Sequence, residues 1–110
     1  MTEINIKNLV KSLVDTFLKA GEVSIELRKK GLIKHIKSDN TPVSNGDLEV
    51  NKIIIKKLYE LTPSIPIISE ETSDNKTNNN LKNFWLVDPI DGTYDYINNL
   101  DEFTINAGLI

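Results

Sequence analysis

Two short apolar segments, at 64–69 and 84–87, are each followed at once by acidic residues. Each segment has the length and the flanking turn residues of a buried β-strand. If the two strands are neighbours in a sheet and run in the same direction, their carboxyl ends lie at the same edge of that sheet. Four acidic side chains would then meet at this edge: Glu70, Glu71, Asp88 and Asp91.

Two other segments show the apolar periodicity of amphipathic helices. Residues 4–29 repeat apolar side chains at three- and four-residue spacing, and Gly31 is a suitable stop. A second helix is expected at 45–60, because Ser44 and Asp47 resemble a capping box and a Thr-Pro pair follows the last turn. We expect the apolar stripe of the first helix to face the core; it consists of Ile6, Leu9, Val10, Leu13, Val14, Phe17 and Leu18.

Three more segments complete the predicted elements. Residues 33–50 begin as a strand and pass into a turn-rich stretch, and 72–80 form a polar, asparagine-rich loop. Apolar side chains alternate along 103–110, which predicts a strand with one buried face. Natural domains rarely stop on an unclosed apolar strand, so the chain is expected to be cut short.

Composition excludes several kinds of site. The chain has no cysteine, which excludes disulfides, thiolate metal sites and thiol catalysis. No apolar run approaches the ~18 residues of a membrane span, and the N-terminus lacks a secretory signal. A cytoplasmic location is therefore expected, and neither a membrane nor a nucleic-acid polymer is an expected partner.

The charges are distributed unevenly along the chain. Residues 1–57 hold 11 Lys and Arg against 7 Asp and Glu, whereas residues 58–110 hold 2 against 9. The acidic half is either a solvated face or a set of carboxylates that bind cations, because clustered acids repel unless metals or protons neutralise them. Charge alone favours the solvated face.

The segment "DPIDGT" at 88–93 adds backbone groups to the acidic edge. The Ile90 carbonyl can turn toward a cation, and Gly92 lets another group approach the backbone closely. The amides of Gly92 and Thr93, at the start of a helical turn, would form an anion-binding pocket beside that cation. Oxygen ligands suit Mg²⁺ or Mn²⁺, and metals plus amides around one anion describe a phosphate-ester hydrolase.

Each of these residues also has an ordinary structural interpretation. Asp-Gly pairs are most often plain turns. Asp47 and Thr93 could serve only as helix caps, and Glu70 and Glu71 only as a solvated pair. The residues taken singly leave both interpretations open.

Three motifs in this order carry a family resemblance. "KSDNTPVSNGD" (37–47), "SEE" (69–71) and "WLVDPIDGT" (85–93) resemble the inositol monophosphatase superfamily of metal-dependent, lithium-sensitive phosphatases. Within it, about residues 6–110 are most similar to the 3'(2'),5'-bisphosphate nucleotidase branch of the CysQ type. The resemblance implies an α/β (α+β layered) sugar-phosphatase fold with two helices packed on a mainly antiparallel sheet. Residues 1–110 would be the N-terminal portion of one phosphatase domain.

The resemblance also implies a set of metal ligands. Glu70 matches a metal ligand that also positions the attacking water, and Glu71 matches the neighbouring acid. Asp88 resembles a carboxylate that bridges two ions, the Ile90 carbonyl a main-chain ligand, and Asp91 a ligand of the second ion. The implied cofactor is two or three Mg²⁺ ions, with Mn²⁺ as an alternative and Li⁺ as an inhibitor.

Three residues are implied to act on water and substrate. Thr93 and Asp47 match a hydroxyl-carboxylate pair that activates the nucleophilic water. The amides of Gly92 and Thr93 would hold the substrate phosphate. A helix-capping Asp47 and a water-activating Asp47 are compatible roles.

The implied reaction is removal of the 3'-phosphate of adenosine 3',5'-bisphosphate, a by-product of sulfur assimilation, to give AMP. Two alternatives stay open. One is hydrolysis of inositol monophosphate or a sugar phosphate; the other is a truncated, non-catalytic chain that needs a second-half polypeptide or a homo-oligomer. Family members are more than twice this length, and their second half supplies another metal-ligating aspartate. The chain also departs from the family at Gly46, where alanine is common, and at 94–96, where the branch more usually has Lys-Glu-Phe.

Overall fold

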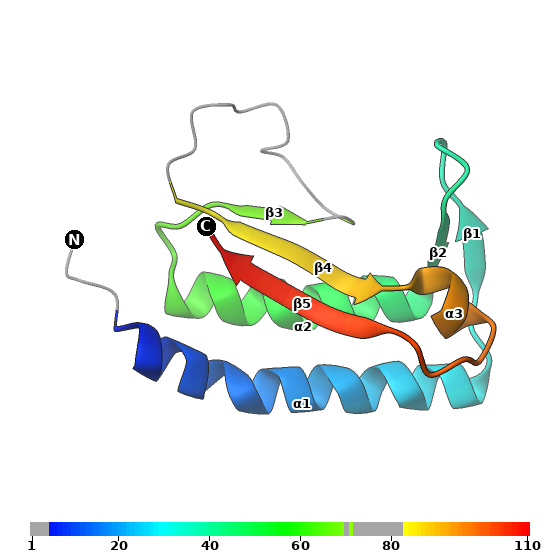
Figure 1. Ribbon diagram of the computed structural model, residues 1–110, viewed down its shortest axis with the longest axis horizontal. Coiled ribbons are helices and arrows are strands. Elements are labelled where there is room, and N and C mark those ends of the chain that lie inside the picture. Colours follow the sequence, from blue (N-terminus) through cyan, green and yellow to red (C-terminus); the bar gives the residue numbers. More distant parts are fainter. Residues whose placement is uncertain (1–4, 70, 72–82) are drawn as a thin grey trace.

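Two long helices cover one face of a three-stranded β-sheet in the computed structural model of this protein (Figure 1). The structure describes residues 5–69, 71 and 83–110. In this part of the chain, no helix has the length and apolar character required to cross a membrane. In chain order the elements are α1 (Ile6–Lys30), β1 (Lys34–Ile36), β2 (Pro42–Ser44), α2 (Asn45–Leu61), β3 (Ile67–Ser69), β4 (Trp85–Asp91), α3 (Thr93–Ile97) and β5 (Thr104–Leu109).

The larger sheet has the strand order β3-β4-β5. Strands β3 and β4 are parallel, with Ile67 beside Trp85 and Ser69 beside Val87. The two apolar segments are therefore neighbours that run in the same direction, as the acidic edge requires. Strand β5 is antiparallel to β4, and β1 pairs with β2 in a separate antiparallel hairpin. Antiparallel pairing thus predominates, as expected.

Helix α2 begins at the capping box that the sequence predicts. The Ser44 side chain accepts a hydrogen bond from the Asp47 N–H, and the Asp47 carboxylate accepts one from the Ser44 N–H at 2.8 Å. At the other end, the Thr62 hydroxyl donates to the Leu58 carbonyl at 2.8 Å and accepts from the Trp85 indole N–H at 2.9 Å. Both ends of α2 are therefore fixed by side chains, and the second end is tied to β4.

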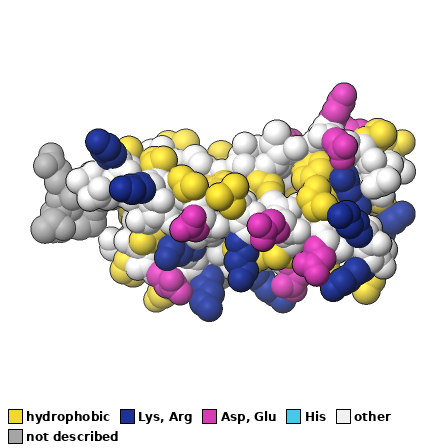
Figure 2. All heavy atoms as spheres, turned by 90° about the horizontal axis from the view of Figure 1, so that it is seen from below, with side chains coloured by type: hydrophobic (Ala, Val, Ile, Leu, Met, Phe, Trp, Pro, Cys, Tyr) yellow, Lys and Arg dark blue, Asp and Glu magenta, His cyan; other side chains and the backbone are white. Residues whose placement is uncertain are grey.

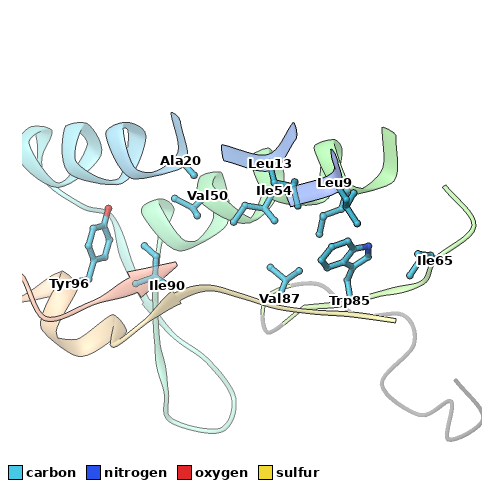
Figure 3. Close-up of a cluster of buried hydrophobic side chains, with 11 residues drawn as sticks. Leu9, Leu13, Ala20, Val50, Ile54, Ile65, Trp85, Val87, Ile90 and Tyr96 are labelled. Atoms are coloured by element: carbon cyan, nitrogen blue, oxygen red, sulfur yellow. The ribbon is translucent and has the colours of Figure 1, made fainter. Parts of the chain in front are cut away.

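The hydrophobic core lies between the two long helices and the sheet. Figure 3 shows Leu9 and Leu13 of α1 and Ile54 of α2 on one side, with Val87 and Trp85 of β4 facing them. The core side chains that solvent does not reach at all are Ala20, Val50, Ile54, Leu58 and Tyr96. Tyr96 comes from the short helix α3, so the core extends from the sheet to the turn that follows β4.

The expectation that the whole apolar stripe of α1 faces the core is wrong. Leu9 and Leu13 are buried and Phe17 is half-buried, but four members of the stripe are exposed. A helix turns about 100° per residue, so the residue after Leu9 or Leu13 faces sideways rather than toward α2. Figure 2 shows hydrophobic side chains among charged ones on the face seen from below. The exposed members are Ile6 (56%), Val10 (58%), Val14 (50%) and Leu18 (63%).

A matched pair of valines tests this assignment. Val50 is fully buried and Val10 is 58% exposed, and both lie within helices. We expect Val50→Ala to lower the free energy of unfolding by about 2 kcal/mol, because it removes buried methyl groups and leaves a cavity. Val10→Ala should change it by less than about 0.5 kcal/mol. Denaturant unfolding of the two variants measures both values, and equal losses would contradict the exposed placement of Val10.

Candidate active site

A pocket of about 300 Å³ opens at the carboxyl end of β4, between the β1–β2 hairpin and the start of α3. It collects six of the residues that the sequence singles out as ligands or phosphate contacts. The seventh, Asp47, does not line the pocket but is bonded to Thr93, which does; the eighth, Glu70, lies outside the described residues. The lining residues are Lys37, Thr41, Pro42, Glu71, Asp88, Ile90, Asp91, Gly92, Thr93 and Tyr94.

The Asp47 carboxylate joins two helices. Asp47 is 1% exposed, and its Oδ1 accepts a hydrogen bond from the Thr93 hydroxyl of α3 at 2.9 Å. Its Oδ2 accepts from the Ser44 N–H at 2.8 Å and from the Ser44 hydroxyl at 2.6 Å. The same carboxylate therefore caps α2 and holds Thr93, so the two interpretations of Asp47 describe one arrangement.

The Thr93 hydroxyl has two acceptors within reach. It lies 2.9 Å from Asp47 Oδ1 and 3.1 Å from the Ile90 carbonyl oxygen. A hydroxyl carries one proton, so it donates to one acceptor at a time and keeps its lone pairs for another donor. When the hydroxyl donates to Asp47, its oxygen can accept a hydrogen bond from a group in the pocket.

The turn between β4 and α3 depends on glycine. Gly92 has φ of 93° and ψ of 43°, in the left-handed region that other residues rarely adopt. A Cβ atom at this position would also lie 2.8 Å from the Glu102 carbonyl oxygen. Helix α3 begins at the next residue, and the first N–H groups of a helix have no partner within it. Gly92 and Thr93 thus bring backbone amides to the wall of the pocket.

Lys37 is a pocket residue to which the sequence interpretation gave no role. Its ammonium group lies 3.4 Å from the Glu71 carboxylate, and the Glu71 side chain is only 6% exposed. A cation among acids offsets their repulsion. The signal was present in the sequence, because Lys37 begins the motif that leads to Asp47, but nothing local to a lysine beside a turn indicates that the turn brings it to Glu71, which follows β3.

The β1–β2 turn and β3 hold the two sides of this ion pair. Asp39 accepts from the Thr41 N–H at 3.1 Å and from the Thr41 hydroxyl at 2.5 Å, and these bonds lower the pKa of Asp39. On the other side, the Ser69 hydroxyl donates to Asn51 of α2 at 2.5 Å and accepts from the Glu71 N–H at 3.3 Å. The Lys37 N–H also donates to the Thr41 carbonyl at 2.8 Å, so hydrogen bonds within the turn help to place Lys37 and the bond to Ser69 helps to place Glu71.

A model of the inositol monophosphatase family matches residues 5–110. The chain belongs to this family. The resemblance drawn from the three sequence motifs is thereby confirmed.

Relatives of this family member include two proteins named 3'(2'),5'-bisphosphate nucleotidase CysQ. The one from Aggregatibacter actinomycetemcomitans is 33% identical over 108 residues, which are 94% of this chain and 39% of the relative. The one from Buchnera aphidicola is 48% identical over 75 residues, which are 67% of this chain and 28% of the relative. The chain thus spans well under half the length of the curated relatives it matches.

Solved structures of the family have the same fold. The crystal structure of CysQ from Bacteroides thetaiotaomicron is 28% identical, with a TM-score of 0.73 over 98% of this chain and 40% of that one. A Staphylococcal inositol monophosphatase is 20% identical, with a TM-score of 0.84 over 99% of this chain and 41% of that one. The expected inositol-monophosphatase-like fold is confirmed.

The oxygen donors that line the pocket of this family member are of the types that bind a hard divalent cation. Glu71, Asp88 and Asp91 offer carboxylates, and Ile90 offers a carbonyl, at a wall with no histidine or cysteine among its described residues. Among residues 5–69, 71 and 83–110, no group of three His, Cys, Asp or Glu side chains is arranged to hold a metal ion. Glu70, the ligand expected to join the two aspartates, lies outside these ranges. The donor types fit, and the metal ligands stay a prediction.

Tyr96 makes the site region sensitive to alkaline pH. Burial, and secondly the Asp47 charge, raise the pKa of the Tyr96 hydroxyl to about 12, although Arg28 opposes them. An unfolded tyrosine titrates near pH ~10, so the folded protein keeps this proton longer. The stability that this adds is fully present below about pH 10 and is lost as the pH rises toward 12.

We expect phenolate absorbance to show a late tyrosine transition near pH 12 in the wild type, and Tyr96→Phe to remove it. The free energy of unfolding should fall more steeply above about pH 10 in the wild type than in Tyr96→Phe. The control is Tyr59→Phe, since Tyr59 is 64% exposed on α2. A late transition that persists in Tyr96→Phe would contradict the assignment.

Proposed function

We propose that this chain contributes the water-activating and phosphate-binding part of a Mg²⁺-dependent phosphomonoesterase. The observation that carries the proposal is the Thr93–Asp47 hydrogen bond beside the acidic wall of one pocket. A hydroxyl-carboxylate pair next to oxygen ligands and helix-start amides is an arrangement that can support hydrolysis of a phosphate ester.

The proposed metal ligands are the carboxylates of Glu70, Asp88 and Asp91 and the Ile90 carbonyl, with Glu71 as a further acid. The bound ions would lower the pKa of water and stabilise the charge on the phosphate oxygens. Solved members of the family support a divalent cation, because one is described as complexed with Mg²⁺ and phosphate and another with NADP and Ca²⁺.

The side chains of Thr93 and Asp47 would then accept the proton that the attacking water loses. Thr93 donates to Asp47 and uses a lone pair to take a hydrogen bond from the attacking water. As the water oxygen forms its bond to phosphorus, its proton passes to the Thr93 oxygen while the Thr93 proton passes to Asp47. The bond from phosphorus to the ester oxygen breaks as the new bond forms, and the leaving oxygen takes a proton from a solvent water molecule and departs as a hydroxyl; Asp47 later returns its proton to solvent. The amides of Gly92 and Thr93 hold the phosphate during this step.

The proposed substrate is adenosine 3',5'-bisphosphate, hydrolysed at its 3' position to AMP and phosphate. The two nucleotidase relatives at 33% and 48% identity support this choice. Inositol monophosphate and sugar phosphates are the competing substrates, and one family structure is described as bound with D-inositol-1-phosphate. Because the chain matches 39% of its nucleotidase relative, a second-half polypeptide is part of the proposal.

A turnover assay tests the proposal. The chain is assayed alone and with a separately expressed polypeptide that corresponds to the remaining part of the nucleotidase relatives. We expect Mg²⁺-dependent phosphate release from adenosine 3',5'-bisphosphate that exceeds release from inositol monophosphate. Asp88→Asn should lower kcat by at least about 100-fold, whereas Asp15→Asn, at an exposed position of α1, should leave it unchanged.

Three results would contradict the proposal. Turnover that persists in EDTA would contradict the proposed metal dependence. Faster phosphate release from inositol monophosphate than from adenosine 3',5'-bisphosphate would contradict the proposed substrate. No turnover with either substrate, with and without the second polypeptide, would leave the chain as a non-catalytic member of the family.

Cation binding can be measured without turnover. We expect saturating Mg²⁺ to raise the unfolding midpoint of the wild-type chain by about 5 °C or more, because a ligand at 100 times its Kd adds about 2.7 kcal/mol. The double variant Asp88→Asn/Asp91→Asn should lose this shift, while Asp15→Asn retains it. Equal shifts in all three proteins would place the cation elsewhere.

A further inference from the structure

Tyr96 links three elements around the candidate site. It has no exposed surface, and its hydroxyl donates to the Ser24 carbonyl of α1 at 2.6 Å. The Phe103 ring packs against it edge-on, with 4.8 Å between the ring centroids, and the Arg28 guanidinium lies 5.7 Å from its centroid. Figure 3 shows the hydroxyl of Tyr96 pointing away from α3 toward α1. Helix α3 is therefore held against α1 through one side chain.

The same hydroxyl group also touches the start of α2. A Cβ atom added at Gly46 would lie 2.7 Å from two ring carbons of Tyr96 and closer still to its oxygen. Separations under 3.0 Å do not occur for real Cβ atoms, so something would have to shift. Gly46 has ordinary helical backbone angles, since it is not among the residues with positive φ. Glycine is needed here for close approach and not for backbone conformation.

Gly46 and Tyr96 are each covalently close to one member of the water-activating pair. Gly46 directly precedes Asp47 on α2, and Tyr96 follows Thr93 by three residues on α3. Two contacts thus connect the short helix to α2: the Thr93–Asp47 hydrogen bond and the packing of Tyr96 on Gly46. Because α3 has only five residues, a shift at Tyr96 must also move Thr93.

We propose that Tyr96 is a positioning residue that, by packing on Gly46, sets the position of the Thr93 hydroxyl relative to the Asp47 carboxylate. The proposal rests on the proposed function, in which these two groups activate the attacking water. The bond from Tyr96 to Ser24 and the edge-on packing of Phe103 fix the position of the ring, so the backbone at Gly46 has to fit against a ring that is already held in place.

A set of substitutions separates positioning from simple packing. Gly46→Ala adds a methyl group that the Tyr96 hydroxyl opposes, and Tyr96→Phe removes that hydroxyl. In the double variant Gly46→Ala/Tyr96→Phe the ring loses both the hydroxyl and its bond to Ser24, so the two ring carbons within 2.7 Å of the new Cβ can move away from it. Gly21→Ala is the matched control, because Gly21 is also helical and a Cβ there meets nothing within 4 Å. Tyr59→Phe is the control for loss of a hydroxyl, at a side chain that is 64% exposed.

We expect Gly46→Ala to lower kcat of the folded protein by about tenfold or more, because small misplacements of reacting groups cost large factors in rate. KM should change by less than about twofold, because Asp88 and Asp91, which belong to β4, and the Gly92 amide lie outside the displaced helix. The double variant should recover most of the lost kcat, and both control variants should match the wild type. Unchanged kcat in Gly46→Ala, or a loss that Tyr96→Phe does not relieve, overturns the proposal.

A measurement without substrate keeps this test independent of the proposed reaction. The NMR signal of the Thr93 amide should shift in Gly46→Ala, return toward its wild-type position in the double variant, and stay in place in Gly21→Ala. If the wild type shows no turnover under any condition, the proposed function fails, and these shifts alone decide whether Tyr96 positions the pair. A Thr93 signal that does not move in Gly46→Ala overturns the positioning role.

Discussion

The structure depends on one buried carboxylate that accepts hydrogen bonds from two helices. The Asp47 carboxylate accepts hydrogen bonds from the Ser44 N–H and hydroxyl at the start of α2 and from the Thr93 hydroxyl at the start of α3. A buried charge is costly unless its oxygens are hydrogen-bonded, and here both oxygens have donors. The interaction that begins the helix therefore also sets the geometry of the candidate site.

The parallel pairing of β3 with β4 provides the other half of the site. It places the ends of both strands at one edge, so that Glu71 and the aspartates of β4 line the same pocket. Carboxylates gathered in this way repel each other, and the ammonium group of Lys37 offsets part of that repulsion. The hairpin that carries Lys37 thus acts on the electrostatics of the pocket as well as on its shape.

Sequence patterns predicted local features better than they predicted which surfaces are covered. The capping box at Ser44 and the two strands before the acidic residues follow from residues that lie close together in the chain, and the structure has them, although these strands are less buried than expected: Leu86 is 50% exposed. The apolar stripe of α1 followed the same periodicity, yet Val10 and Leu18 are exposed. Periodicity identifies an apolar side of a helix, but the neighbours that cover it come from distant parts of the chain.

The sequence by itself determined the two long helices, the strands that precede the acidic motifs, and the family, because each of these depends on the spacing of residues within short segments. It predicted only a turn-rich stretch where β2 lies. Tertiary structure alone decided the role of Lys37 in the pocket and the need for glycine at position 46. Lys37 meets Glu71 across 34 residues, and Gly46 meets Tyr96 across 50 residues of the chain. Contacts of this kind arise only when the chain folds, since no local pattern encodes which distant side chain will occupy the space.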